Sequence, residues 1–256
     1  MNTDWPGTIG GTILDDVGSQ SAIPLHPVGS RYVLNDRVFR YCHIRDGINT
    51  LTRGSVAVSY NTASVEKGAS IGAITNGSSV LEWTVIQREI TADQFADGYI
   101  LMQGGFVKGI RSHGAAKTGT VVKLNLKEPI TQATAAAGNY GMLCEGLYSN
   151  VMGRTFGSTG PGLIVGVPVA DFDEDYYAWL QTWGPCGVTA AAPILNDTGQ
   201  VTGITPGGIT AGDQVMTIAT NAAMTQEERI IGYSIPYNTN NWDDEGYRML
   251  FLTISP

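Results

Sequence analysis

The stretch RYVLNDRVFRYCHI, from Arg31 to Ile44, decides the fold class of this chain. It reads as two short extended segments on either side of an Asn35-Asp36 turn. In the second segment Val38, Arg40, Cys42 and Ile44 alternate with Phe39, Tyr41 and His43. Successive side chains of a β-strand leave opposite faces of the sheet, so this alternation predicts a β-hairpin whose second strand is half-buried.

Similar patterns recur towards the C-terminal end and predict an all-β protein, either a β-sandwich or a β-barrel. Strands are expected at 31–34, 37–45, 54–60, 80–90, 98–103, 106–111, 118–126, 141–152, 163–169, 176–183, 200–204, 213–219, 229–235 and 247–254. Helical patterns are scarce, with single turns expected at 91–98 and 225–230. Residues 30–256 form either one β domain or two subdomains, and TQATAAAG, near 131–138, is the best candidate for a joint between two.

Residues 1–29 predict an extended N-terminal arm. The segment has three prolines and five glycines. Proline fixes φ and lacks an N–H group, and glycine is entropically costly to order, so the arm should form no regular structure by itself. Its spaced apolar residues could dock on this domain or on a neighbour, and we expect the arm to cross to a neighbouring subunit with Trp5 as an anchor. The candidate interface residues are Trp5, Ile9, Ile13, Leu14 and Ile23.

The composition is poor in charged residues, which bears on the kind of protein this is. Charged residues make up 15% of the chain, against roughly 25% in ordinary globular proteins. A surface of small neutral polar groups suits a protein that neighbours cover in an assembly, although a Gly-rich β protein with many turns would show the same composition. The net charge of −8, with the basic residues scattered, argues against nucleic-acid binding.

No apolar run reaches the length of a membrane span, and the N-terminal sequence lacks the features of a signal peptide, so we expect neither a membrane nor a secreted location. Three cysteines lie far apart at Cys42, Cys144 and Cys186. An odd number without metal-binding spacing predicts free, mostly buried thiols in a reducing cytoplasm.

No motif supplies a catalytic, cofactor-binding or metal-binding set, so we expect no enzyme and no cofactor. GIRSHGAAKT (109–118) lacks the Lys that follows the second Gly of a phosphate-binding loop. Asp171, Asp173 and Asp175 have the spacing that opens an EF-hand, but Tyr176 replaces its Gly and Thr182 its bidentate Glu. An acidic turn is expected there, and a looser Ca²⁺ site shared with a neighbour stays open.

The aromatic stretch YYAWLQTWGPCG (176–187) places Tyr177, Trp179, Gln181 and Trp183 on one face of a strand. Large aromatic side chains on one strand face usually belong to a core. The alternative is a sugar-binding surface.

The order of three segments resembles a family of tailed-bacteriophage virion proteins that decorate the head. The first segment is PLHPVGSRYVLNDRVFRYCHIRDGINTLTRGSVAV. The second comprises ITADQFADGYILMQGG and GIRSHGAAKTGTVVKLNLKEPI. The third comprises VGVPVADFDEDYYAWLQTWGPCGV and RIIGYSIPYNTNNWDDEGYRMLFLTI. The resemblance covers most of residues 24–254, and this family has no catalytic residues to carry over.

The resemblance implies a decoration or cement protein that binds the outside of a phage capsid and stabilises it. The implied partners are the major capsid protein and further copies of this chain, most simply as a homotrimer. The implied location is the capsid exterior of a virion assembled in the host cytoplasm. The alternatives are a tail or head-fibre structural protein, a host-glycan-binding module and a β-fold hydrolase.

Overall fold

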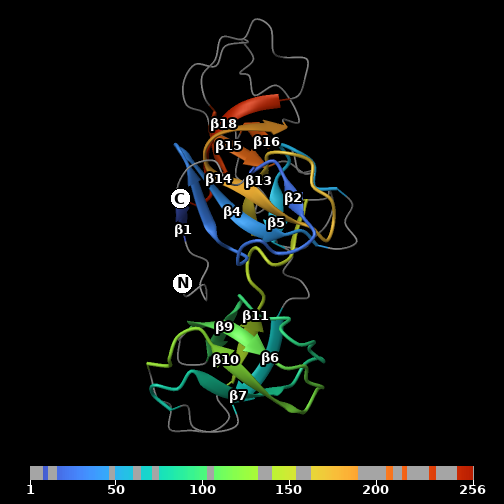
Figure 1. Ribbon diagram of the computed structural model, residues 1–256, viewed down its shortest axis with the longest axis vertical. Helices are drawn as coiled ribbons and strands as arrows, with labels where there is room; N and C mark the ends of the chain where they lie inside the picture. Colours follow the sequence, from blue (N-terminus) through green and yellow to red (C-terminus); the bar gives the residue numbers. More distant parts are fainter. Residues whose placement is uncertain are drawn as a thin grey trace, which may run out of the picture.

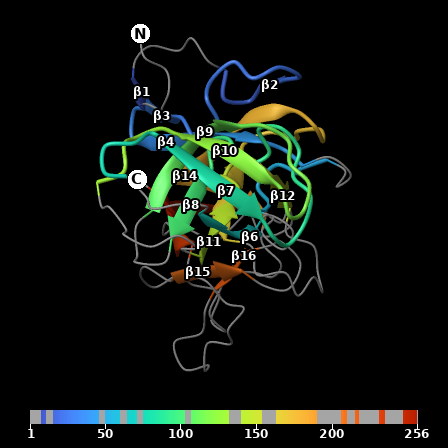
Figure 2. The same cartoon turned by 90° about the horizontal axis from the view of Figure 1, so that it is seen from below.

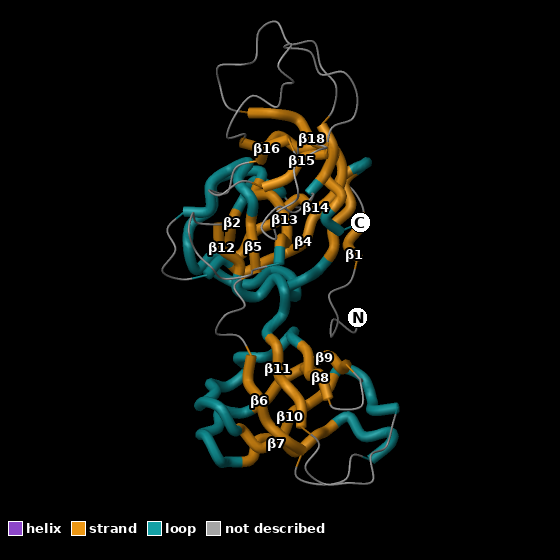
Figure 3. Tube along the Cα trace, turned by 180° about the vertical axis from the view of Figure 1, so that it is seen from behind, coloured by secondary structure: helices purple, strands orange, loops and turns teal. Residues whose placement is uncertain are grey.

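The computed structural model of this protein describes residues 8–10, 16–45, 50–59, 65–70, 75–102, 107–131, 140–153, 163–189, 206–209, 215–217, 231–234 and 247–255. All the regular elements in these ranges are strands, as the strand-coloured tube in Figure 3 shows. The predicted all-β fold class is therefore confirmed. No helix in the described ranges is long and apolar enough to cross a bilayer.

The strands form two units that lie one above the other along the long axis of the molecule (Figure 1). The first is a closed antiparallel barrel with the strand order β10-β7-β6-β11-β8-β9. Its strands are β6 (Val65–Ser70), β7 (Val80–Val85), β8 (Tyr99–Met102), β9 (Val107–His113), β10 (Val121–Leu126) and β11 (Tyr140–Cys144). Seen from below in Figure 2, these strands lie in front of the second unit.

The barrel closes around a single indole ring. Trp83 is fully buried and lies over Gly68 of β6 and Gly141 of β11, which are direct partners in the β-ladder. A Cβ atom at Gly68 would lie 2.3 Å from Trp83 Nε1, and one at Gly141 would lie 2.4 Å from the Leu101 carbonyl oxygen. Two glycines are needed here because a barrel of six strands has no other room for an indole among the aliphatic side chains of its core.

The second unit is a sheet that contains twelve strands within the described ranges, and we call it the sheet unit. Its main path runs β1-β3-β4-β14-β18-β17-β15-β16, and β2, β5, β12 and β13 pair off this path. The bounds are β1 (Thr8–Gly10), β2 (Gln20–Ser21), β3 (Arg31–Leu34), β4 (Arg37–His43), β5 (Ala57–Ser59), β12 (Val151–Gly153), β13 (Ile164–Pro168), β14 (Tyr177–Thr189), β15 (Pro206–Ile209), β16 (Val215–Thr217), β17 (Gly232–Ser234) and β18 (Tyr247–Thr253).

The hairpin that decides the fold class lies at the centre of the sheet unit. β4 and β14 are paired, and both of their faces are covered. One face carries an aromatic cluster of Tyr32, Phe39, Tyr41 and Trp179, and the other packs Cys42 and Leu180 with residues of β5, β12 and β13. The alternation predicted for β4 is confirmed, because Phe39 and Tyr41 lie on one side and Cys42 on the other. The strand is not half-buried as predicted, since both of its faces pack against other side chains.

The barrel is an insertion within the sheet unit. The chain leaves the sheet unit after β5 and returns at β12, and β5 and β12 are antiparallel neighbours. The predicted joint near 131–138, of which 132–138 lie outside the described residues, instead follows β10 and precedes β11, two strands of the same barrel. A run of small residues marks a loop, but it does not reveal whether that loop joins two units or two strands of one unit.

The arm contributes two short strands, which the sequence did not predict. β1 pairs in parallel with β3, and β2 pairs with the start of β14. An extended segment can add to a sheet through its backbone N–H and C=O groups whatever its side chains are. Most of the other predicted strands are present, but β6 and β15 were not predicted, and the strand expected at 141–152 is divided into β11 and β12. β14 also continues beyond its predicted end, and residues 91–98 form turns. The strand expected at 200–204 and the turn expected at 225–230 lie outside the described residues.

Candidate functional site

The arm is held against the sheet unit of its own chain over residues 16–29. Leu25 N donates a hydrogen bond to the Tyr41 hydroxyl oxygen at 3.1 Å, and Gly29 N donates to the Tyr41 carbonyl at 2.8 Å. The His26 ring meets Tyr41 edge-on at 5.2 Å and lies 5.3 Å from Trp179. These contacts fix the path of the arm, so its side chains have defined directions.

Ile23 and Leu25 are the large apolar residues of this fixed segment that are mostly exposed. They flank Pro24, and their relative exposures are 66% and 62%. Ile23 was among the predicted interface residues, whereas Leu25 was not. The Ile23-Pro24-Leu25 sequence could have drawn attention to Leu25, because two branched aliphatic residues around a proline cannot both continue a buried strand.

The side chains of the other four predicted interface residues are not described by the structure. Ile9 lies in β1 opposite Tyr32, and its backbone alone is described. Trp5, Ile13 and Leu14 lie outside the described residues. The described part of the arm therefore does not bring the five predicted residues together into one surface.

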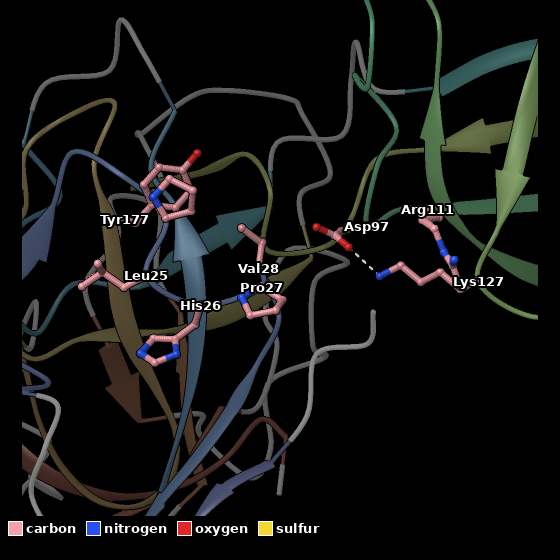
Figure 4. A pocket seen from close by; sticks show the side chains of 9 residues that line it. Leu25, His26, Pro27, Val28, Asp97, Arg111, Lys127 and Tyr177 are labelled. Atoms are coloured by element: carbon pink, nitrogen blue, oxygen red, sulfur yellow. Dashed lines mark hydrogen bonds and ion pairs between the residues drawn. The ribbon is translucent and has the colours of Figure 1, made fainter. Parts of the chain in front are cut away.

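A cleft of about 560 Å³ lies where the arm faces the barrel (Figure 4). Pro24–Val28 and Tyr177 line it from the sheet unit, and Asp97, Arg111 and Lys127 line it from the barrel. Tyr177 stacks on Tyr41 with ring centroids 6.0 Å apart. Burial, and then the neighbouring Asp175 carboxylate, raises the pKa of Tyr177. The cleft thus has one apolar wall and one charged wall.

Two of the three charged residues of this wall pair with each other. Lys127 Nζ donates to Asp97 Oδ1, and the Lys127 side chain is only 2% exposed. Among the residues that line the cleft, Asp97 is the single carboxylate, so the cleft lacks the carboxylate pair that would favour a hydrolase. The residues that line the cleft therefore do not form a recognisable catalytic set.

The acidic turn does not gather its carboxylates around one point. Asp171 Oδ1 accepts from Arg53 N at 2.7 Å, Asp173 Oδ2 accepts from the Gln20 side chain at 2.8 Å, and Asp175 Oδ1 lies 3.2 Å from His43 Nε2. Each carboxylate therefore serves a different partner. Within the described residues no group of His, Cys, Asp and Glu side chains could hold a metal ion.

His113 has a structural role in the barrel. Its buried ring accepts from Phe95 N at Nε2, at 2.9 Å, and its Nδ1 lies 2.8 Å from the Gly114 carbonyl oxygen. Because a backbone N–H occupies Nε2, the proton is on Nδ1 and donates to that carbonyl. Both nitrogens are thus engaged with backbone groups, and neither is available as a general base.

The aromatic strand belongs to a core, as the sequence predicted. Trp179 and Gln181 are buried, and Trp183 packs edge-on against Phe251 at 5.5 Å. Gln181 Nε2 donates to the carbonyls of Trp183 and Pro185, which satisfies the buried amide. The packed aromatic rings therefore support the sheet and do not form an open platform for a sugar.

The three thiols are unpaired, as the sequence predicted. Cys42 and Cys186 are buried, and desolvation raises the pKa of each thiol to about 12. Burial also raises the pKa of the half-buried Cys144. A thiol with a raised pKa is a poor nucleophile, because the thiolate is the reactive form.

Comparisons with known proteins identify no relative. No family model matches the sequence, no curated protein matches it, and no solved structure matches the fold.

Proposed function

We propose that this chain is a virion structural protein that binds the outside of a tailed-phage head and stabilises it. The order of the sequence segments that resemble the decoration family supports this role, as does the low content of charged residues. A protein that bridges the subunits of a shell adds binding free energy only to the assembled lattice, and so stabilises it against internal pressure.

The observation that carries the proposal is the pair Ile23 and Leu25 on a fixed segment of the arm. Both are about two-thirds exposed, while the backbone around them is tied to Tyr41. A preorganised segment loses little entropy when it binds, so most of the apolar burial contributes to affinity. Burying the exposed two-thirds of the two side chains contributes about 2–4 kcal/mol per copy, and a repeating lattice multiplies this effect.

The described parts of the chain support a binding role better than the alternatives from other classes. The cleft holds a single carboxylate, which is paired with Lys127, and both nitrogens of His113 bind backbone groups. The large aromatic residues of β14 pack in the interior. A hydrolase and a glycan-binding module are therefore less well supported than a structural protein without a cofactor.

In this proposal the partner is the major capsid protein, and the chain acts on the capsid exterior as a homo-oligomer, most simply a trimer. A tail or head-fibre structural protein is the alternative within the same class. The same apolar pair would then contact a tail or fibre subunit.

The test is co-sedimentation of the purified protein with empty heads assembled from the major capsid protein of the same phage. Wild-type protein should pellet with the heads, and Ile23→Asp with Leu25→Asp should lose most of this binding. Leu163→Asp is the matched control, because Leu163 is also an exposed leucine of the sheet unit. Its carbonyl accepts from Ser59 N of β5, and β5 packs on the face of β4 and β14 opposite to the aromatic cluster that the arm contacts. Wild-type protein that stays in the supernatant would contradict the proposal, and pelleting with purified tails would support the alternative.

A further inference from the structure

The outer surface of the barrel has two chemically different sides. On one side, β7 and β10 place Glu82 opposite Lys123, and Asn125 Nδ2 donates to the Ser112 hydroxyl oxygen of β9 at 2.9 Å. Valines occur on this side too, but charged and amide groups separate them. This side therefore has the mixed surface of a soluble monomer.

On the other side, β11, β8 and the start of β9 carry apolar side chains at consecutive outward positions. Leu101 of β8 lies between Met142 of β11 and Val107 of β9, and it pairs directly with each of them. One step along the same face, Tyr99 lies opposite Cys144. We call this set the apolar barrel face, and its members are Tyr99, Leu101, Val107, Tyr140, Met142 and Cys144.

The side chains of the apolar barrel face are exposed to solvent in the single chain. Tyr140 is 65% exposed and Val107 is 52% exposed, and Tyr99 and Leu101 are both more than a third exposed. No member is charged. These four side chains present on the order of 350 Å² of surface, which is in the range of the largest apolar patch on a typical monomer.

That area suits the core of a protein–protein interface. A stable interface covers about 800 Å² on each partner, with an apolar centre inside a polar rim. The apolar barrel face supplies roughly half of that area as a centre, and the polar residues around it complete the rim. Because a closed barrel has no free strand edge, contact here must occur through side chains and not through an added strand.

We infer that the apolar barrel face is the surface through which copies of this chain associate with one another. Copies with a net charge of −8 repel each other over most of their surface, so the self-association that the proposed function requires costs least at a face where neither copy carries a charge. Burying the uncharged face of one copy against that of another leaves no unpaired charge in the contact. The inference rests on the proposed function as an assembling protein and assigns the self-contact to the barrel, apart from the arm.

The test places a carboxylate in the apolar barrel face and measures self-association by sedimentation velocity over a wide range of protein concentration. Wild-type protein should sediment as an oligomer. Val107→Glu should raise the dissociation constant at least about 100-fold, because every contact would bury an unpaired carboxylate. Tyr140→Glu, two strands away on the same face, should have the same effect.

Val121→Glu is the matched control. Val121 has the same side chain and almost the same exposure, 50%, but it lies on β10 opposite Thr84 on the mixed side of the barrel. It should leave the dissociation constant within about threefold of the wild-type value, which corresponds to a surface substitution. Circular dichroism should show that all three variants are folded, since each site is exposed in the single chain.

A wild-type protein that is monomeric at every concentration would overturn the inference, as would a Val107→Glu variant that associates like the wild type. Variants that stay oligomeric but fail to pellet with heads would also overturn it, because the face would then contact the shell, and the proposed function would stand. Variants that dissociate, together with a wild type that does not bind heads, would uphold the inference and refute the proposed function.

Discussion

Replacing Glu66 by glutamine should strongly destabilise the barrel, although the substitution exchanges only one oxygen for one nitrogen. Glu66 is fully buried in β6 and accepts three backbone hydrogen bonds. Its Oε1 accepts from Ile86 N at 3.0 Å and Gln87 N at 2.6 Å, and its Oε2 accepts from Arg88 N at 3.1 Å. One carboxylate thus fixes the turn that follows β7.

The size of the stability loss depends on how many of these hydrogen bonds the glutamine amide can keep. A glutamine side chain at this position would offer one oxygen to three N–H donors, and its NH₂ group would face a donor in the remaining position. Hydrogen bonds to charged groups contribute about 1.5–3 kcal/mol each, and a buried group that loses its partner costs a similar amount. Arg88, whose Nε lies 3.9 Å from Glu66 Oε2, would also lose its anion. We expect a loss of about 3 kcal/mol, a large part of the 5–15 kcal/mol typical of a folded domain.

Urea unfolding at neutral pH, followed by circular dichroism, measures this loss. Glu82→Gln is the matched control, because Glu82 is exposed on β7 opposite Lys123 and should change stability by less than about 0.5 kcal/mol. Adding Arg88→Met to Glu66→Gln should recover part of the loss, because it removes the unpaired cation. If Glu66→Gln is as stable as the control, the buried carboxylate does not hold the turn and the reasoning fails.

Three further predictions concern the rest of the chain. Gly141→Ala should destabilise the barrel by about 3 kcal/mol or more, because its Cβ would meet backbone at 2.4 Å beside Trp83; thermal unfolding measures this, and an unchanged Tm would contradict the tight packing. Since burial raises the pKa of Cys42 and Cys186 from 9.0 to about 12, their contribution to stability is full below pH 9. This contribution should fall by about 1.4 kcal/mol per pH unit for each thiol above pH 9. Urea unfolding at several alkaline pH values measures the fall, and the prediction fails if the wild type loses no more stability than a variant with both cysteines replaced by alanine. Deleting residues 1–29 should lower the Tm of the sheet unit, because the aromatic cluster loses its cover; an unchanged Tm would mean that the arm contributes no stability.

The local alternation of side chains was enough to predict most strands, and β3 agrees to the residue. β6 was missed because its sequence, VEKGAS, places Glu66 and Gly68 at inward positions. Neither residue is apolar, yet one caps a turn and the other makes room for Trp83. Both roles depend on partners distant in sequence, so no local pattern could reveal them.

The extension of β14 was missed for a related reason. The prediction ended at Trp183 because Gly184 and Pro185 follow, but the strand continues to Thr189. Gly184 has φ of +86°, and a Cβ atom there would lie 2.3 Å from the Asp36 carbonyl oxygen. The glycine therefore marks a close approach between β14 and the turn before β4, and it does not end the strand.

The candidate surfaces were only partly predictable. Ile23 was found because apolar residues are sparse in the arm. The sequence YILM (99–102) held a second signal, since a strand with apolar residues at every position has no polar face to turn towards water. Its burial in fact alternates, with Ile100 and Met102 inside the barrel and Tyr99 and Leu101 outside. Which face is inside depends on barrel closure, and closure depends on pairing between distant strands.

The insertion of the barrel places the two proposed binding surfaces on separate units of the chain. Because β5 and β12 are direct neighbours, with Val151 opposite Ser59, the chain leaves and re-enters the sheet unit at one place. An insertion whose two ends lie side by side leaves the host fold intact. Each unit has its own buried core, so a carboxylate placed on the outside of the barrel does not disturb the sheet that supports the arm. We therefore expect the proposed self-association through the barrel and the proposed shell binding through the arm to be separable, so that a variant in one surface reports on that surface alone.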